Sequence, residues 1–296
     1  MRQISQNGRY IKIMLKSNLS EIQQDYDAFL VDLWGVIHDG ENIYPGAREA
    51  LEKLKSQGKQ VVFLSNAPRR KTLAAEGLLN VRVSSDLYYD VITSGEVTFE
   101  YVTSLNFSFG NKYYLINEQQ VDLLDNSGKT RVKNPNDADF VVAIGFENHT
   151  STLEEKAPEL EACKAKNLPM ICANPDMVVV NIIGESWLCA GVLAEAYIKM
   201  GGDVQYFGKP YPEIYTKAID LLKKTPKSRI AAIGDNLNTD ILGANNFGID
   251  SYFIAGGIHA KELGIKHGTL PDLIKAEELS KKYNSKPTGI LPGFIY

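Results

Sequence analysis

The chain has 296 residues, of which 44% are hydrophobic and 23% are charged, and its formal net charge is -4. This length suits two domains, or one domain with a large insertion, and a mildly acidic chain without a basic block argues against nucleic acid or an anionic membrane as a partner. No apolar run approaches the ~18 residues of a membrane span, and the amino terminus shows no apolar segment of signal-peptide length. The three cysteines lack C-x-x-C spacing and are expected to be buried thiols in a reducing compartment, so the cytoplasm is the expected location.

The first third of the chain alternates between strand and helix patterns. Apolar runs predict strands at residues 29–31 and 61–64, and residues 91–95 are predicted to form a third strand that ends in a turn at Ser94-Gly95. Residues 47–57 have helical spacing, with Gly58 placed as the C-cap, and Pro68 suits the first turn of a helix that runs to about Leu79. The order strand, helix, strand, helix, strand predicts a parallel sheet with right-handed crossovers.

From about Glu96 the pattern changes, and a second α/β unit is expected. Its predicted elements are a strand at 139–146, a helix at 153–165 and a strand at 169–173. The first pattern then resumes, with helices at 190–200, 212–223 and 240–247 and strands at 204–207, 229–233 and 251–255. The apolar segment 289–294 is expected to dock on the core or on another subunit. The simplest organisation is a split core, residues 1–95 and 186–296, with residues 96–185 inserted as a lid.

Polar residues stand where several predicted strands end. They are Asp32, Ser65-Asn66, Gly208-Lys209-Pro210, and the run from Gly234 to Asp240. Each has an ordinary structural interpretation when taken alone: Ser65 caps the next helix, Lys209 is a solvated loop lysine, and the aspartates are turn and cap residues.

Together, these residues supply what phosphoryl transfer requires. Two carboxylates can hold an octahedral Mg²⁺ that also binds substrate phosphate. A lysine, a hydroxyl and backbone amides neutralise charge on the transferring group. A carboxylate that faces the phosphorus can attack it and form an acyl phosphate, which water later hydrolyses.

This combined pattern resembles the haloacid-dehalogenase-like (HAD) superfamily, and within it the class IIA phosphatases with a large inserted type-2 cap. The resemblance covers roughly residues 25–258 and includes four further segments, Gly35–Gly40, Ile92–Gly95, Ala173–Asp176 and Gly208–Ile214. It implies an α/β fold in which a Rossmann-like parallel-sheet core (1–95 and 186–296) carries an inserted α/β cap domain (96–185). Members of this class act on sugar phosphates, nucleotides, pyridoxal phosphate and nitrophenyl phosphate.

The resemblance also assigns roles to individual residues. Asp32 is the expected nucleophile, and Mg²⁺ is expected on Asp32, the backbone carbonyl of Trp34 and Asp235, with Asp240 in support. The expected phosphate-binding set is Ser65, Asn66 and Lys209, assisted by the amide of Gly35, and Lys209 is also counted as catalytic. The loop Ala173–Asp176 is expected to contact the substrate from the cap.

Trp34 departs from the family pattern, which has a second aspartate two residues after the nucleophile as general acid and base. Indole has no useful proton to donate or accept, and losing a positioned acid–base group typically costs about 10²–10⁴-fold in rate. The true dehalogenases carry an aromatic residue here but need no Mg²⁺ site. Because this chain keeps Asp235 and Asp240, phosphoryl chemistry is favoured over carbon–halogen hydrolysis. His38 is a substitute acid or, as favoured here, a flap-loop residue with a structural hydrogen bond.

The leading hypothesis is a Mg²⁺-dependent phosphatase of small sugar phosphate-like or nucleotide-like metabolites. Two alternatives stay open: a phosphometabolite-binding protein with little turnover, and a hydrolase of a non-phosphate bond. No nucleic-acid or membrane partner is expected, and a homodimer is possible. His149, His259 and His267 show no metal-ligand spacing and are expected at the surface.

Overall fold

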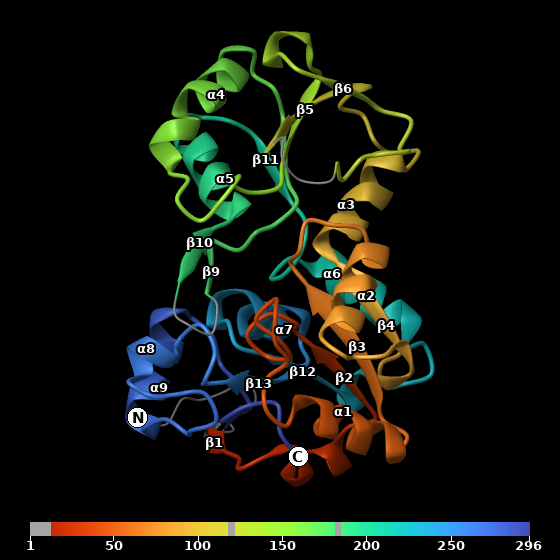
Figure 1. The fold of residues 1–296 in the computed structure, drawn as a ribbon, viewed down its shortest axis with the longest axis vertical. Helices are drawn as coiled ribbons and strands as arrows, with labels where there is room; N and C mark the ends of the chain where they lie inside the picture. Colours follow the sequence, from red (N-terminus) through yellow and green to blue (C-terminus); the bar gives the residue numbers. More distant parts are fainter. Residues whose placement is uncertain (1–12, 118–121, 181–184) are drawn as a thin grey trace. The chain divides into compact units, whose positions relative to one another are not determined.

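The computed structural model describes residues 13–117, 122–180 and 185–296, and these form two compact units (Figure 1). Of the described residues, unit 1 comprises 13–64, 77–91 and 215–296, and unit 2 comprises 65–76, 92–117, 122–180 and 185–214. The division into a catalytic core and a cap at the boundaries given above stays a prediction.

A seven-stranded sheet forms the centre of unit 1. Its strands, in spatial order, are β1 (Met14–Leu15), β14 (Gly289–Leu291), β13 (Asp250–Ile254), β12 (Ile230–Gly234), β2 (Ala28–Val31), β3 (Gln60–Ser65) and β4 (Asp90–Thr93). The pairs from β1 to β3 in this order run parallel. Every residue of β2 is buried, as expected for a parallel strand covered on both faces.

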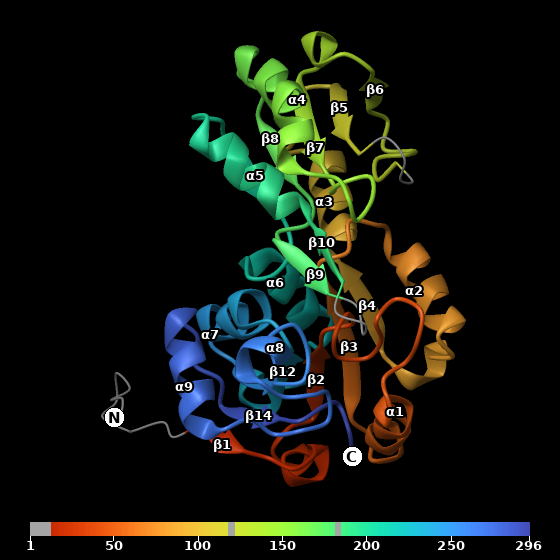
Figure 2. The same cartoon turned by 60° about the vertical axis from the view of Figure 1, so that its left-hand side comes forward.

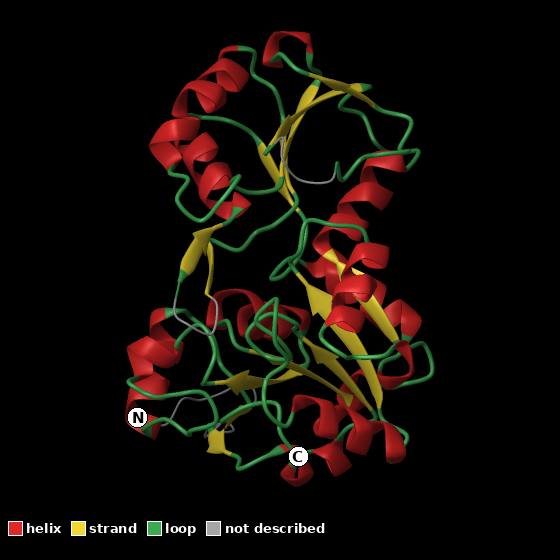
Figure 3. Ribbon diagram, viewed as in Figure 1, coloured by secondary structure: helices red, strands yellow, loops and turns green. Residues whose placement is uncertain are grey.

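Helices lie between these strands along the chain (Figure 3). Unit 1 contains α1 (Ala47–Ser56), α7 (Leu242–Phe247), α8 (Ala260–Leu263) and α9 (Leu273–Lys282), whereas α2 (Lys71–Asn80) and α6 (Pro212–Leu221) cross the unit boundary. The predicted helix at 47–57 is confirmed as α1, which buries Ala47, Ala50, Leu51 and Leu54 on one face. Its C-cap is Gln57 rather than Gly58, and Gly58 follows with a positive φ.

Three predictions of elements need correction. The helix expected from Pro68 begins only at Lys71. Residues Ser94-Gly95, read as a turn, instead begin α3 (Ser94–Thr103), because Thr93 caps the helix by accepting a hydrogen bond from the Glu96 N–H. The strand at 251–255 is not the last one, since β14 adds to the sheet beside β13 and buries the C-terminal segment.

Unit 2 is built around a five-stranded sheet. Its spatial order is β11 (Val204–Tyr206), β8 (Met170–Cys172), β7 (Phe140–Ala143), β5 (Lys112–Ile116) and β6 (Thr130–Val132), all parallel. Two further strands, β9 (Val178–Val180) and β10 (Ser186–Leu188), form an antiparallel ribbon. The pairing of β11 with β8 differs from the expectation that the first pattern resumes there, because a three-residue strand carries no sign of its partner in its own sequence.

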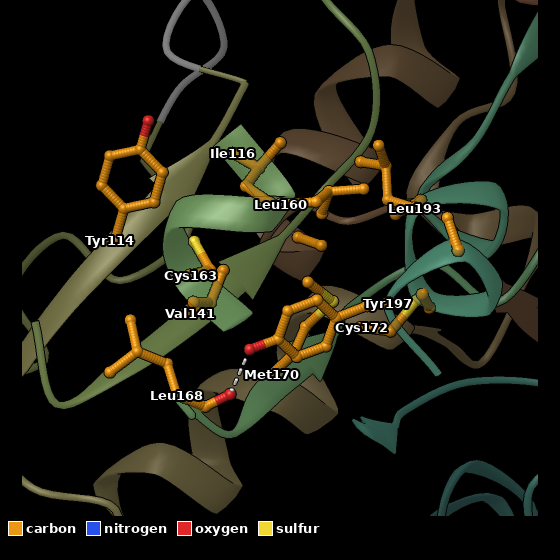
Figure 4. Packing of buried hydrophobic residues seen from close by; sticks show 14 of the residues in the cluster. Tyr114, Ile116, Val141, Leu160, Cys163, Leu168, Met170, Cys172, Leu193 and Tyr197 are labelled. Carbon is orange, nitrogen blue, oxygen red and sulfur yellow. Dashed lines mark hydrogen bonds between the residues drawn. The ribbon is translucent and has the colours of Figure 1, made fainter. Parts of the chain in front are cut away.

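Two helices of unit 2, α4 (Leu153–Ala165) and α5 (Ala190–Lys199), pack against this sheet (Figure 2). Leu160 and Cys163 of α4 and Leu193 and Tyr197 of α5 share one hydrophobic cluster with β7 and β8 (Figure 4). The Tyr197 hydroxyl donates to the Leu168 carbonyl at 2.7 Å, so this buried aromatic residue is fully satisfied. The predicted helix at 153–165 is confirmed as α4.

The parallel sheets with intervening helices confirm the predicted α/β fold class. All three cysteines are buried free thiols, and burial raises the pKa of Cys163 and of Cys172 to about 12. Within the described part of the chain, no helix is both long and apolar enough to pass through a membrane.

Candidate metal centre

Asp32 follows directly after β2, at the carboxyl end of the strand. β2 and β12 are parallel neighbours, with Val31 opposite Ile233, and the Asp32 N–H donates to the Ile233 carbonyl at 2.9 Å. Asp235 follows β12 by one residue. Strand register therefore brings two carboxylates, about 200 residues apart in the chain, to one edge of the sheet, where α/β proteins place their ligands.

Asp240 joins these two residues from the π-helical turn η6 (Leu237–Ile241). One carboxylate oxygen from each of Asp32, Asp235 and Asp240 lies within 4.8 Å of the other two. The three side chains are 8%, 5% and 3% exposed. Buried carboxylates at such distances repel one another unless a cation or protons compensate the charge.

Backbone donors fix the orientation of two of these carboxylates. The Ile258 N–H donates to Asp235 Oδ2 at 2.7 Å, and the Asn236 N–H donates to Asp240 Oδ2 at 3.1 Å. Each of these two carboxylates is thus held in one orientation by a backbone N–H group. Burial, followed by the charges of Asp235 and Asp39, raises the pKa of the Tyr44 phenol above its usual value.

Gly35 lets the backbone of the β2 loop approach Asp235. Its φ is +84°, and a Cβ at this position would lie 2.1 Å from Asp235 Oδ2. Any side chain would therefore displace the carboxylate as well as strain the backbone. The motif Asp32–Gly35 thus requires its glycine for the geometry of the acidic cluster.

Trp34 and His38 belong to the loop after β2. Their rings make an edge-to-face contact at 6.1 Å between centroids. His38 Nδ1 accepts a hydrogen bond from the Gly40 N–H at 2.9 Å, which requires that nitrogen to carry no proton. This contact supports the interpretation of His38 as a loop residue with a structural hydrogen bond.

The phosphate-binding candidates Ser65, Asn66 and Lys209 belong to unit 2. Ser65 is the last residue of β3, and its hydroxyl accepts from the Ala67 N–H at 3.2 Å. Asn66 and Lys209 are joined directly: Asn66 Oδ1 accepts from the Lys209 N–H at 2.7 Å, and Asn66 Nδ2 donates to the Lys209 carbonyl at 3.0 Å. All three are buried.

His259 is not at the surface, as the sequence suggested, but 5% exposed. Its Nε2 accepts from the Leu237 N–H at 3.3 Å, and its Nδ1 lies 2.8 Å from Glu262 Oε2. His259 therefore ties the start of η6, which carries Asp240, to α8. Sequence reasoning missed this role because a lone histidine has no spacing that marks a tertiary contact.

The donor set of the acidic cluster suits a hard divalent cation. Three carboxylates offer only oxygen, the ligand type preferred by Mg²⁺, Ca²⁺ and Mn²⁺. The fold and this site define an α/β protein with buried carboxylates, arranged as in cation-binding centres, at the carboxyl edge of a parallel sheet.

The chain belongs to the haloacid dehalogenase-like hydrolase family, whose model matches residues 26–248. It is 25% identical over 262 residues to an acid sugar phosphatase of Staphylococcus aureus, covering 87% of this chain and 97% of the relative. Its structure is similar to that of a haloacid dehalogenase-like hydrolase from Brucella suis, with TM-score 0.79, 29% identity and coverage of 95% and 100%. A 4-nitrophenylphosphatase from Thermotoga maritima has TM-score 0.68, 25% identity and coverage of 92% and 96%. The predicted family and its Rossmann-like fold are confirmed.

Proposed function

We propose that the chain is a divalent cation-dependent phosphatase that hydrolyses small phosphomonoesters of the sugar phosphate or nucleotide type. The observation that carries the proposal is the buried cluster of Asp32, Asp235 and Asp240, with their oxygens within 4.8 Å of one another. The family membership and the relatives that are named as sugar and nitrophenyl phosphatases give it further support.

The proposed resident cation is Mg²⁺, held by Asp32, Asp235 and the backbone carbonyl of Trp34, with Asp240 in support. Mg²⁺ at such a site would neutralise charge on the phosphate and orient it toward the attacking carboxylate. The N–H groups of Ile258 and Asn236 already hold the carboxylates of Asp235 and Asp240 in fixed orientations before a cation binds.

Asp32 acts as the nucleophile in this proposal. One of its carboxylate oxygens forms a bond to phosphorus while the bond from phosphorus to the ester oxygen breaks, which gives an aspartyl phosphate and the free alcohol or phenol. Water then attacks the phosphorus, releases phosphate and restores the carboxylate. In the first step an alkoxide leaving group takes its proton from water, since Trp34 has none to give.

The proposed phosphate ligands are Ser65, Asn66 and Lys209, with the amide of Gly35. A lysine and several hydrogen-bond donors are what a phosphoryl group needs to disperse the charge of its non-bridging oxygens. Lys209 is 3% exposed, so water screens its charge only weakly.

The test is phosphate release from 4-nitrophenyl phosphate and a panel of sugar phosphates by the purified chain. Release with Mg²⁺ is expected to be at least about 10²-fold faster than with EDTA or with the Asp32→Asn variant. The matched control is Asp39→Asn, because Asp39 is a buried carboxylate of the same loop whose Oδ1 accepts from the Glu41 and Asn42 N–H groups. Equal rates in EDTA, or full activity of Asp32→Asn, would overturn the proposal.

Trp34 favours a second candidate, a phosphometabolite-binding protein with little turnover, because the usual acid–base group is absent. This candidate predicts that a phosphorylated metabolite raises the melting temperature while no phosphate is released over long incubation. Phosphate release at a rate proportional to the concentration of the chain would exclude this binding-protein candidate.

A further inference from the structure

Two loops of unit 2 are neighbours because the strands before them are neighbours. β8 and β11 run parallel with Cys172 opposite Tyr206, and the Phe207 N–H donates to the Cys172 carbonyl at 3.0 Å. The loop after β8 carries Asp176, and the loop after β11 carries Lys209. The carboxyl ends of these two strands therefore bring an acidic residue and the proposed phosphate-binding lysine into one region of unit 2.

Asn66 connects the two loops through its side-chain amide. Besides its two bonds to the backbone of Lys209, its Nδ2 donates to Asp176 Oδ1 at 3.0 Å. Both amide hydrogens and the amide oxygen are thus engaged. The side chain is 4% exposed, so these contacts are shielded from water.

The contact with Asp176 reinforces one of the two orientations that the Asn66 amide can adopt. A carboxylate accepts hydrogen bonds and cannot donate them, so the Asn66 nitrogen must face Asp176. With the amide reversed, its oxygen would face both the carboxylate and the Lys209 carbonyl, and its nitrogen would face the Lys209 N–H. Asp176 therefore favours the same orientation that the two backbone polar groups of Lys209 require.

Asp176 is itself held in place by backbone contacts. Its N–H donates to Asn174 Oδ1 at 3.1 Å, and its carbonyl accepts from the Gly191 N–H at 3.1 Å, at the start of α5. The carboxylate therefore projects from an anchored loop rather than from a freely moving one.

Packing around Gly208 leaves little room for adjustment. A Cβ there would lie 2.6 Å from Asn66 Oδ1, 2.9 Å from Ser94 Cβ and 3.0 Å from Pro175 Cδ. Ser94 Oγ in turn lies 3.0 Å from the Ala67 carbonyl oxygen and 2.5 Å from the Ala173 carbonyl oxygen, which share its one hydroxyl proton. Asn66, the loop after β8 and the loop after β11 therefore form one close-packed group.

We propose that Asp176 is a positioning residue for phosphate binding: through the Asn66 amide, it fixes the backbone of Lys209. The inference rests on the proposed role of Lys209 as a phosphate ligand. It gives Asp176 no contact with the reacting atoms.

A double-mutant cycle with Lys209 tests this inference. Asp176→Ala is expected to lower kcat/KM for 4-nitrophenyl phosphate about 10-fold and to raise the inhibition constant of inorganic phosphate by a similar factor. In the Lys209→Met background the same substitution should change both constants less than about twofold, because Asp176 acts through the lysine. A purely structural role predicts equal losses in both backgrounds, and that result would overturn the inference.

Two further variants keep the test interpretable. Asp176→Asn retains an acceptor oxygen on a side chain of the same size, so its kcat/KM should fall less than that of Asp176→Ala. If thermal unfolding shows that Asp176→Ala is misfolded, Asp176→Asn replaces it in the cycle. Asp203→Ala, an exposed aspartate just before β11, is the matched control and should behave as the wild type. Wild-type hydrolysis tests the proposed function separately. If the wild-type chain does not hydrolyse the substrate, the proposed function fails. The double-mutant cycle is then measured with the dissociation constant of inorganic phosphate in place of kcat/KM.

Discussion

At the scale of single residues, Trp34 determines which phosphate esters suit the proposed chemistry. The position two residues after Asp32 carries an indole, which packs edge-to-face against His38 instead of presenting an acid. His38 Nδ1 accepts a hydrogen bond from the Gly40 N–H, so this ring nitrogen has no proton to give. Leaving groups that depart without a proton should therefore react best.

Trp34→Asp should raise turnover on sugar phosphates by up to about 10²-fold, because it restores a general acid near the ester oxygen. Turnover on 4-nitrophenyl phosphate should change little, since nitrophenolate leaves unprotonated. Trp34→Asn is the control, as it removes the indole without supplying a proton. The measurement is the steady-state rate of each variant on both substrates. Equal rates of Trp34→Asp and Trp34→Asn on sugar phosphates would contradict the role given to Trp34.

At the scale of elements, His259 links η6 to α8 and α9. It accepts from the Leu237 N–H, lies against Glu262, and Glu262 pairs with Lys282 of α9 at 2.7 Å. Burial lowers the pKa of His259 below its usual value, and the hydrogen bond to Glu262 only partly opposes this effect. The neutral form is the one that can accept from Leu237.

This pKa shift predicts how stability depends on pH. Below about pH 6.5 the unfolded chain protonates His259 while the folded chain resists, so the free energy of unfolding should fall as the pH falls. Above that pH the contribution is fully present. Urea unfolding between about pH 5 and pH 8 should show a shallower decline for His259→Gln than for the wild type. His267, whose pKa burial also lowers, contributes equally to both proteins. Identical pH profiles would contradict the assignment.

Elements whose signals are local could be predicted from the sequence. The spacing of Ala50, Leu51 and Leu54 marks α1, and the capping box of Thr152 and Glu155 accompanies α4, whose bounds were predicted correctly. The start of α3 was missed because Ser94-Gly95 is typical of a turn. β14 was missed because a strand of three residues is defined by its neighbours β13 and β1 rather than by its own pattern.

The candidate site, too, has residues that could be predicted from the sequence and residues that could not. Asp32, Asp235 and Asp240 could be proposed because carboxylates after strands are visible in the chain and parallel strands end at one edge. The contact of Asp176 with Asn66 and the burial of His259 depend on which loops pack together. Neither residue has a sequence spacing that reveals its partner.

At the scale of the whole molecule, the acidic cluster depends on the pairing of β2 with β12. Asp32 and Asp235 meet only because Val31 lies opposite Ile233 in this parallel pair. A shift of register by one residue would turn one of the two side chains to the other face of the sheet and separate the carboxylates. The proposed chemistry is therefore a property of the folded sheet and not of either motif alone.

The most direct test of this account is a crystal structure of the chain grown with Mn²⁺, examined by anomalous scattering. We expect one strong anomalous peak within coordination distance of Asp32 and Asp235, and its loss in crystals of Asp235→Asn. A wild-type crystal without a peak there, or an undiminished peak in the variant, would contradict the assignment of these carboxylates as the cation site.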